Sequence, residues 1–213
     1  MSLQAFQQAI VELTLAPRRV RQLLRGDLSV LANYDLTERE RRRVLDAVRQ
    51  PGMALNCTIA RGNRFEAVAE MFPMTCVLLK PVLRELLDEL WEAPPTNYQF
   101  EGEEEAFMGI VRRKLASGEL AIEYLEEIFG YESRCVELAQ RMRGQADQDG
   151  ESEAIVEFHH PPELLLVPLS EYTAPPPGLP TGIYRARLTL RGEQFDVEML
   201  AASLDGPDAG RPN

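Results

Sequence analysis

The feature that most constrains the fold of this chain is a change of hydrophobic period close to residue 150. Before that point, apolar residues recur every three or four positions, which is typical of amphipathic helices. After it, they alternate with polar residues, which indicates strands. Residues 144–152 are polar and contain glycine, so we expect a linker or exposed loop there. The sequence therefore predicts the α+β class, with a multi-helix N-terminal domain over residues 1–145 and a small antiparallel β-domain over residues 153–202.

Six or seven helices are predicted in the first part of the chain. Thr37 and Glu40 have the spacing of a capping box, which indicates that a helix begins there. A broad apolar stripe between Pro73 and Trp91 predicts a core helix, and Pro81 inside the stripe predicts a kink or a late start. The expected helices cover residues 3–14, 17–25, 38–50, 54–71, 73–91, 107–115 and 120–143.

The second part of the chain is predicted to be mainly strands. Residues 154–158 and 163–167 are rich in apolar side chains and are both expected to be strands. The clearest hairpin signal is the pair of segments 183–190 and 194–200, which flank the turn Arg191-Gly192-Glu193. The residues expected to share a face are Tyr184, Ala186, Leu188 and Leu190 in the first segment, and Phe195, Val197 and Met199 in the second. Residues 203–213 are polar and contain Gly and Pro, so a disordered tail is expected there.

The charge of the chain limits the partners that it can bind. A net charge of −11 argues against general binding to nucleic acid or to membrane surfaces, both of which need positive charge. The charge is uneven, because residues 17–64 hold 11 Arg and 5 acidic residues, a balance of +6. Residues 65–213 hold 12 basic and 28 acidic residues, a balance of −16. The basic stretch could therefore meet an acidic partner or another face of the same protein.

Several observations favour a cytoplasmic location. No apolar run reaches the ~18 residues that a membrane-spanning helix needs. The N-terminal residues lack the basic start of a signal peptide. The three cysteines, Cys57, Cys76 and Cys135, are odd in number and widely spaced, as is typical of buried thiols in a reducing compartment. Arg outnumbers Lys by 21 to 2, which is typical of GC-rich bacterial genomes.

The sequence offers few residues for catalysis. The only two histidines, His159 and His160, are neighbours on an expected strand and point to opposite faces, which suits metal chelation poorly. We expect them at a strand end, with one bonding the backbone. Gly-rich phosphate loops and zinc spacings are absent from the sequence, and no Glu-x-x-His pair falls on an expected helix. We therefore predict no catalytic site, metal or cofactor. An enzyme in its own right is the least favoured hypothesis, since it would need a bound metal or cofactor.

A cluster of arginines between residues 39 and 43 suggests a second kind of function. Its members are Arg39, Arg41, Arg42 and Arg43, which we predict to contact a partner. The alternative is a transcription-associated DNA-binding protein that uses this helix. Against that hypothesis stand the interspersed Glu38, Glu40 and Asp46 and the lack of an aromatic or amide-rich recognition face. A solvated helix face is the simplest interpretation of the cluster.

Three segments in a fixed order carry a family resemblance. A helix that ends in Phe72-Pro73 is followed by an apolar helix, by a helix with an aromatic start at Phe107, and by Tyr124-Leu125 at the start of a long helix. This order resembles a helical family once labelled a putative DNA-binding domain. One branch of that family is the partner subunit in methanobactin biosynthesis. It accompanies a multinuclear non-haem iron oxidase that modifies ribosomally made peptides. The resemblance covers residues 55–140 and is weaker over residues 160–200.

The resemblance implies a non-catalytic subunit that pairs with an iron oxidase and offers a sheet edge to the leader of a precursor peptide. An extended peptide adds to such an edge by main-chain hydrogen bonds. The candidate edge is one strand of the 183–200 hairpin, where Tyr184, Arg185, Arg187 and Arg191 are predicted to contact the peptide. The three arginines are expected to attract its acidic residues. The alternative is that this hairpin packs on the helical domain with its arginines in water.

Overall fold

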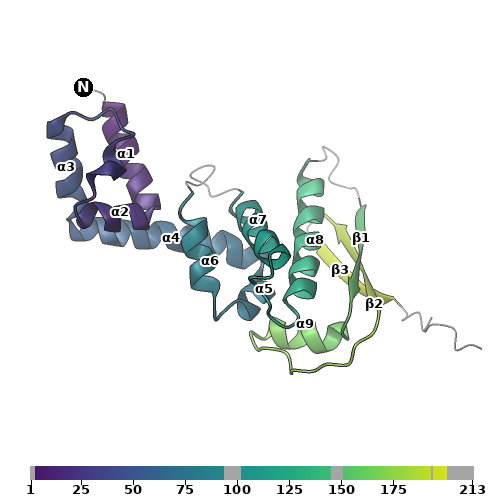
Figure 1. Cartoon of the computed structure of the whole chain (residues 1–213). Helices are drawn as coiled ribbons and strands as arrows, with labels where there is room; N and C mark the ends of the chain where they lie inside the picture. The colour runs from purple at the N-terminus through teal and green to yellow at the C-terminus, as the bar shows by residue number, and fades with distance from the viewer. Residues whose placement is uncertain (1–2, 94–101, 145–150, 193, 201–213) are drawn as a thin grey trace, which may run out of the picture. The chain divides into compact units, whose positions relative to one another are not determined.

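The structure, a computed structural model, describes residues 3–93, 102–144, 151–192 and 194–200. Within these residues it contains nine α-helices and one three-stranded antiparallel sheet, which confirms the predicted α+β class (Figure 1). The chain divides into two compact units. The helical unit comprises Met1–Glu70 and Val82–Ser117, and the sheet unit comprises Met71–Pro81 and Gly118–Asn213.

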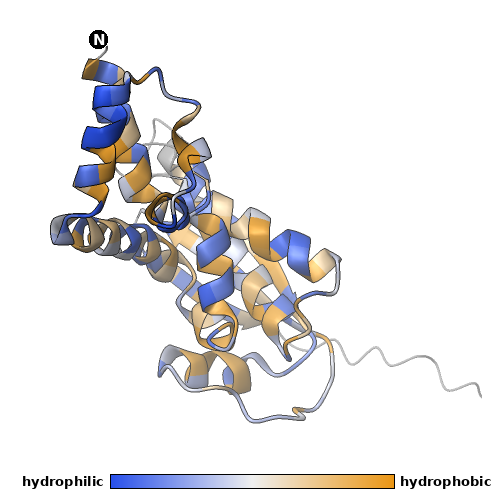
Figure 2. Cartoon of the chain, turned by 60° about the vertical axis from the view of Figure 1, so that its left-hand side comes forward, coloured by the Kyte–Doolittle hydropathy of each residue, from blue (hydrophilic) through white to orange (hydrophobic). Residues whose placement is uncertain are grey.

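The helical unit contains six of these helices and one short 3₁₀ helix. In chain order they are α1 (Leu3–Leu15), α2 (Pro17–Leu24), η1 (Leu28–Leu31), α3 (Glu38–Val48), α4 (Pro51–Met71), α6 (Leu83–Leu90) and α7 (Glu103–Ala116). Helix α3 begins with the expected capping box, because the Thr37 hydroxyl accepts from the Glu40 N–H while the Glu40 carboxylate accepts from the Thr37 N–H. Apolar and polar residues alternate around the helices, as Figure 2 shows.

Apolar side chains from α1 to the start of α4 form one core of the helical unit. Its buried members are Ala9, Leu13, Val20, Leu23, Leu31, Tyr34, Leu36, Val44, Val48, Met53 and Cys57. Further along α4, the buried Arg64 donates to the Glu103 carboxylate at 2.9 Å and to the carbonyl oxygens of Leu90 and Ala93 at 2.9 and 3.0 Å. This guanidinium therefore ties α4 to the end of α6 and to the start of α7.

The sheet unit contains the remaining elements. They are α5 (Pro73–Leu78), α8 (Leu125–Gly144), β1 (Glu151–Phe158), α9 (Pro162–Ser170), β2 (Tyr184–Arg191) and β3 (Gln194–Leu200). The strand order is β1-β2-β3, so β2 is the central strand. Helix α8 packs against β1 and β2, and α5 packs against both α8 and α9. At the start of α5, the N–H groups of Met74 and Thr75 each donate to the buried carboxylate of Glu132 on α8, both at 2.8 Å.

The core helix expected over residues 73–91 is broken into α5 and α6, as the proline inside it predicts. A turn at residues 79–82 separates the two helices and contains Pro81, which has no N–H to donate to a helical ladder. The predicted hairpin is confirmed, with Arg191 and Gln194 paired on either side of a two-residue loop.

The strand expected over residues 163–167 is wrong, because these residues lie in helix α9. A short apolar run does not distinguish a strand from a buried helix by its period. Pro162 provides the deciding signal, since proline is favoured in the first turn of a helix. Leu165 and Leu169, four residues apart, are buried on one side of α9, whereas Val167 is exposed.

The division into units also differs from the boundary expected near residue 145. Helix α8 belongs with the sheet, because its apolar side covers β1 and β2. The predicted linker over 144–152 lies largely outside the described residues, and its last two residues belong to β1. The tail expected at 203–213 also lies outside the described residues.

Candidate functional site

The sheet has one face covered by a helix and one open face. The register alternates residues between the two faces along each strand. The covered face is built from Val156 and Phe158 of β1 and Ala186, Leu188 and Leu190 of β2, all of them buried. The Phe158 ring lies 5.8 Å from that of Tyr131 on α8. Helix α8 therefore seals the apolar face of these two strands.

The apolar face continues onto β3, where the described residues cover it only in part. Phe195, Val197 and Met199 lie opposite Leu190, Leu188 and Ala186, in that order. The β3 residues are 40%, 43% and 40% exposed, whereas their β2 partners are 3%, 0% and 0% exposed. Three apolar side chains in a row are thus left half in water at the edge of the sheet. We call this set the β3 apolar row.

The edge of the sheet at β3 also carries main-chain groups. No described strand pairs with the outer side of β3. The loop between Arg191 and Gln194 has two residues, and Gly192 has a φ of +59°, as a tight hairpin turn requires. Gln194 therefore bonds to β2. Because bonded and non-bonded pairs alternate in an antiparallel ladder, we expect Phe195, Val197 and Met199 to direct their N–H and C=O groups outward.

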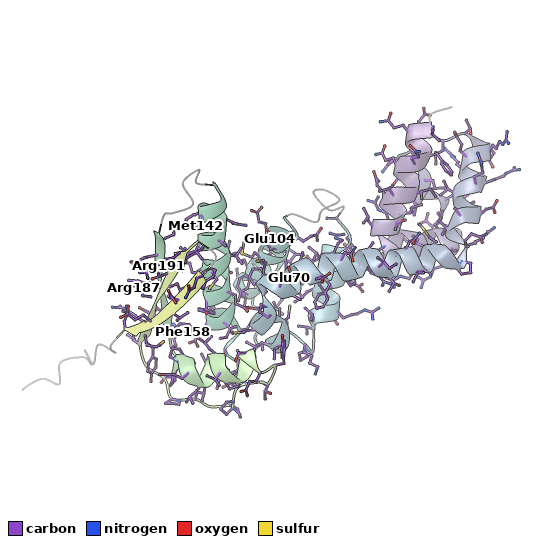
Figure 3. The ribbon with its side chains drawn as sticks, turned by 180° about the vertical axis from the view of Figure 1, so that it is seen from behind. Glu70, Glu104, Met142, Phe158, Arg187 and Arg191 are labelled. Carbon is purple, nitrogen blue, oxygen red and sulfur yellow. The ribbon has the colours of Figure 1, made fainter. Side chains whose placement is uncertain are left out.

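The open face of the sheet carries a row of arginines between two rows of acids. Arg185 on β2 lies 3.2 Å from Glu157 on β1, and Arg187 on β2 lies 3.1 Å from Glu198 on β3. Arg191 lies on the same strand, as Figure 3 shows. Since β2 is the central strand, these arginines are not at a sheet edge. Two of them already have carboxylate partners, which weakens their ability to attract an acidic peptide.

Tyr184, the fourth residue predicted to contact a peptide, lies on the covered face with Ala186. It is half-buried, and its ring lies close to Gly182, where an added Cβ would stand 2.9 Å from the ring. The structure therefore places the four predicted residues on one strand but on both faces. The residues that sequence reasoning did not single out as a site are those of the β3 apolar row. The sequence shows that these apolar residues alternate with polar ones, but it does not show that they are exposed.

The arginine cluster of the helical unit lies on α3. Arg39, Arg41, Arg42 and Arg43 are all exposed. Arg42 pairs with Glu38 at 3.3 Å, and the Arg43 guanidinium lies 5.9 Å from the centre of the Phe6 ring. Helix α3 buries Val44 and Val48 on its other side. The cluster thus has the contacts expected of a solvated helix face with local ion pairs.

The histidines lie at the end of β1, as predicted, but they are held by a side chain. The Glu127 carboxylate of α8 accepts from the N–H groups of His159 and His160 at 2.7 and 3.1 Å, and lies 2.5 Å from the His160 ring Nδ1. Tyr124 packs edge-on against the His160 ring and donates to the Pro176 carbonyl oxygen. A pocket of about 330 Å³ lies beside these residues and includes Glu126 in its lining. This network closes the junction between α8 and β1.

The thiols are poorly suited to nucleophilic chemistry. Burial raises the pKa of the Cys76 thiol to about 12 and that of the Cys135 thiol to about 11. Burial also raises the pKa of Cys57. All three cysteines are free thiols, and at neutral pH they are protonated.

Within the described part of the chain, no group of three or more His, Cys, Asp or Glu side chains could hold a metal ion. No helix among these residues is long and apolar enough to cross a membrane. Searches against protein-family models, curated proteins and solved structures found no match. The family resemblance over residues 55–140 therefore stays a prediction.

Proposed function

We propose that this protein recognises peptides, and that an extended peptide adds to β3 as a fourth strand of the sheet. The observation that carries the proposal is the β3 apolar row, which lies half-exposed along an edge with no described partner strand. Peptide recognition by strand addition needs both features. The main chain supplies affinity, and the alternate side chains supply specificity.

The energetics favour such an addition. Each main-chain hydrogen bond contributes about 0.5–1.5 kcal/mol net, and outward groups on three residues permit several of them. Apolar peptide side chains laid beside Phe195, Val197 and Met199 would remove further apolar surface from water, at about 25 cal/mol per Å². An exposed apolar edge strand promotes self-association, and proteins usually protect their edge strands against it. An edge strand that keeps an exposed apolar row is therefore consistent with a binding role.

The wider role that we propose rests on the family resemblance. In it, the chain is the non-catalytic, cytoplasmic partner subunit of a multinuclear non-haem iron oxidase that modifies a ribosomally made peptide. Three free cysteines are consistent with a reducing compartment. The peptide-binding edge would hold the leader while the oxidase, which would carry the iron, performs the chemistry.

Selection from a displayed library of short random peptides tests recognition at β3. Peptides that bind the full-length chain are expected to lose affinity for Val197→Pro by about tenfold or more, because proline removes the outward N–H of that residue. Val197→Thr is the matched control, since it keeps the N–H and the β-branched shape. Fluorescence anisotropy gives the dissociation constants, and circular dichroism checks that both variants fold. Equal binding by all three proteins contradicts recognition at β3.

Affinity purification of the tagged chain from its native host tests the wider role. We expect an iron-containing protein to co-purify in stoichiometric amount, measured by elemental analysis of the complex. Recovery of the chain as an isolated monomer, without iron in any co-purifying protein, contradicts the role of an oxidase subunit.

A further inference from the structure

We infer that the peptide taken up by β3 alternates apolar residues with basic ones. This inference rests on the proposed function and names the chemistry of its ligand. It follows from the residues that β3 presents on its two faces. The β3 apolar row lies on one face, and Asp196 and Glu198 lie on the other. A strand added to β3 must match both.

The acidic side of β3 is open and only partly neutralised. Glu198 has a side chain that is 65% exposed, and its partner is Arg187 at 3.1 Å. Asp196 is exposed and lies opposite the neutral Thr189. Its contact with a described side chain is a 3.4 Å hydrogen bond accepted from the Gln194 amide, and no described cation pairs with it. Asp196 thus has no described counter-charge, and Glu198 shares one exposed ion pair with Arg187.

The geometry of a sheet places that partner on the added strand. Neighbouring strands lie about 4.8 Å apart, and directly opposite side chains on one face have Cβ atoms about 5 Å apart. A peptide residue opposite Asp196 or Glu198 is therefore within reach of an ion pair if it is Lys or Arg. Its neighbours along the peptide fall on the other face, beside the β3 apolar row. The two requirements together define the alternating pattern.

Charge also decides between a peptide and a second copy of this chain. If β3 paired antiparallel with β3 of another copy, Asp196 and Glu198 of both copies would lie on the same face of the joined sheet. Like charges directly opposite one another are destabilising. The acidic residues thus act against self-pairing and in favour of a basic strand.

Two matched peptides test the inference. Each has about nine residues, capped ends and a fluorescent label, and alternates Val either with Lys or with Glu. Against the full-length chain in ~0.05 M salt, we expect the Val–Lys peptide to bind about tenfold more tightly than the Val–Glu peptide. The preference should shrink at ~0.5 M salt, where charges are screened over a few ångströms.

Variants of Asp196 locate the preference on β3. Asp196→Asn should reduce the ratio of the two dissociation constants about threefold, and Asp196→Lys should reverse the preference. The matched control is Glu153→Gln. Glu153 lies on the same face and opposite the same Thr189, but on the far edge strand β1. It should leave the ratio unchanged.

The outcomes separate the inference from the proposed function. Equal binding of the two peptides, lost in Val197→Pro, overturns the inference and leaves strand addition at β3 intact. A preference for the Val–Glu peptide overturns the inference in the same way. If Val197→Pro does not weaken the binding of either peptide, both the inference and the proposed function are overturned. The same holds if Glu153→Gln changes the binding and Asp196→Asn does not. If sedimentation shows a dimer that Val197→Pro dissociates, the β3 edge binds a second copy of this chain. That result overturns both the inference and the proposed function.

Discussion

Strands β2 and β3 are neighbours in one hairpin and have the same alternation of apolar and charged residues, yet they meet different surroundings. On β2 the apolar residues are sealed by α8, and two of the arginines have carboxylate partners on adjacent strands. On β3 the apolar row is about 40% exposed, and Asp196 has no cation partner among the described residues. The difference shows that position in the sheet, rather than sequence pattern, decides which strand is buried and which is left exposed at the edge.

The largest expected effect is on the free energy of unfolding, when an apolar side chain is shortened on β2 and, for comparison, on β3. Leu188 is fully buried, so Leu188→Ala should lower the free energy of unfolding by about 3–4 kcal/mol. Val197, its cross-strand neighbour, is 43% exposed, and Val197→Ala should lower it by less than about 1 kcal/mol. Urea denaturation followed by circular dichroism measures both. Equal losses would mean that β3 is as well covered as β2.

The next effect concerns the helix that covers β2. Burial raises the pKa of Glu132 on α8 from 4.5 to about 7. Between these values the folded protein holds the proton more tightly than the unfolded chain, so the free energy of unfolding should fall as the pH rises from about 4.5 to 7. A pKa difference of one unit corresponds to about 1.4 kcal/mol, so the fall is at most about 3.5 kcal/mol.

Glu132→Gln should remove this pH dependence, as measured by urea denaturation from about pH 5 to pH 8. Glu126→Gln, at an exposed position of the same helix, is the matched control and should keep the wild-type profile. If the Glu132→Gln profile remains as steep as that of the wild type, another group causes the fall.

A smaller effect is expected from the charges that link the two strands. Arg187 and Glu198 are both in contact with water, with side chains 41% and 65% exposed. A double-mutant cycle with Arg187→Ala and Glu198→Ala should give a coupling energy of less than about 1 kcal/mol. A coupling several times larger would show that β3 is held to β2 mainly by charge.

The smallest effect is expected on α3, far from either strand in the sequence. Arg41→Glu should leave peptide affinity unchanged, since the proposed binding edge consists of β3 residues alone. In a mobility-shift assay at ~50 mM salt, we expect no binding of duplex DNA by the wild type. A salt-sensitive complex that is lost in Arg41→Glu would instead support the DNA-binding hypothesis.

Much of this contrast was predictable from the sequence, but its decisive part was not. The hairpin turn and the two alternating faces follow from Arg191-Gly192-Glu193 and the period of its flanks. Apolar and polar residues alternate in the same way on β2 and β3. The sequence therefore does not indicate that α8 covers β2 and leaves β3 exposed. Helix α9 was missed because Leu164, Leu165 and Leu166 form a run without a period. Long-range pairs such as Glu127 with His160 leave no local signal at all.

The measurement that tests the central claim most directly is amide hydrogen exchange at β3, followed by NMR with and without the tightest peptide from the library. In the free protein, we expect fast exchange at the outward N–H groups of Phe195, Val197 and Met199, and slower exchange at Asp196 and Glu198, whose N–H groups we expect to face β2. Saturation with peptide should slow the first three. If those three exchange as slowly in the free protein, or at the same rate when peptide is bound, β3 is not a peptide-binding edge.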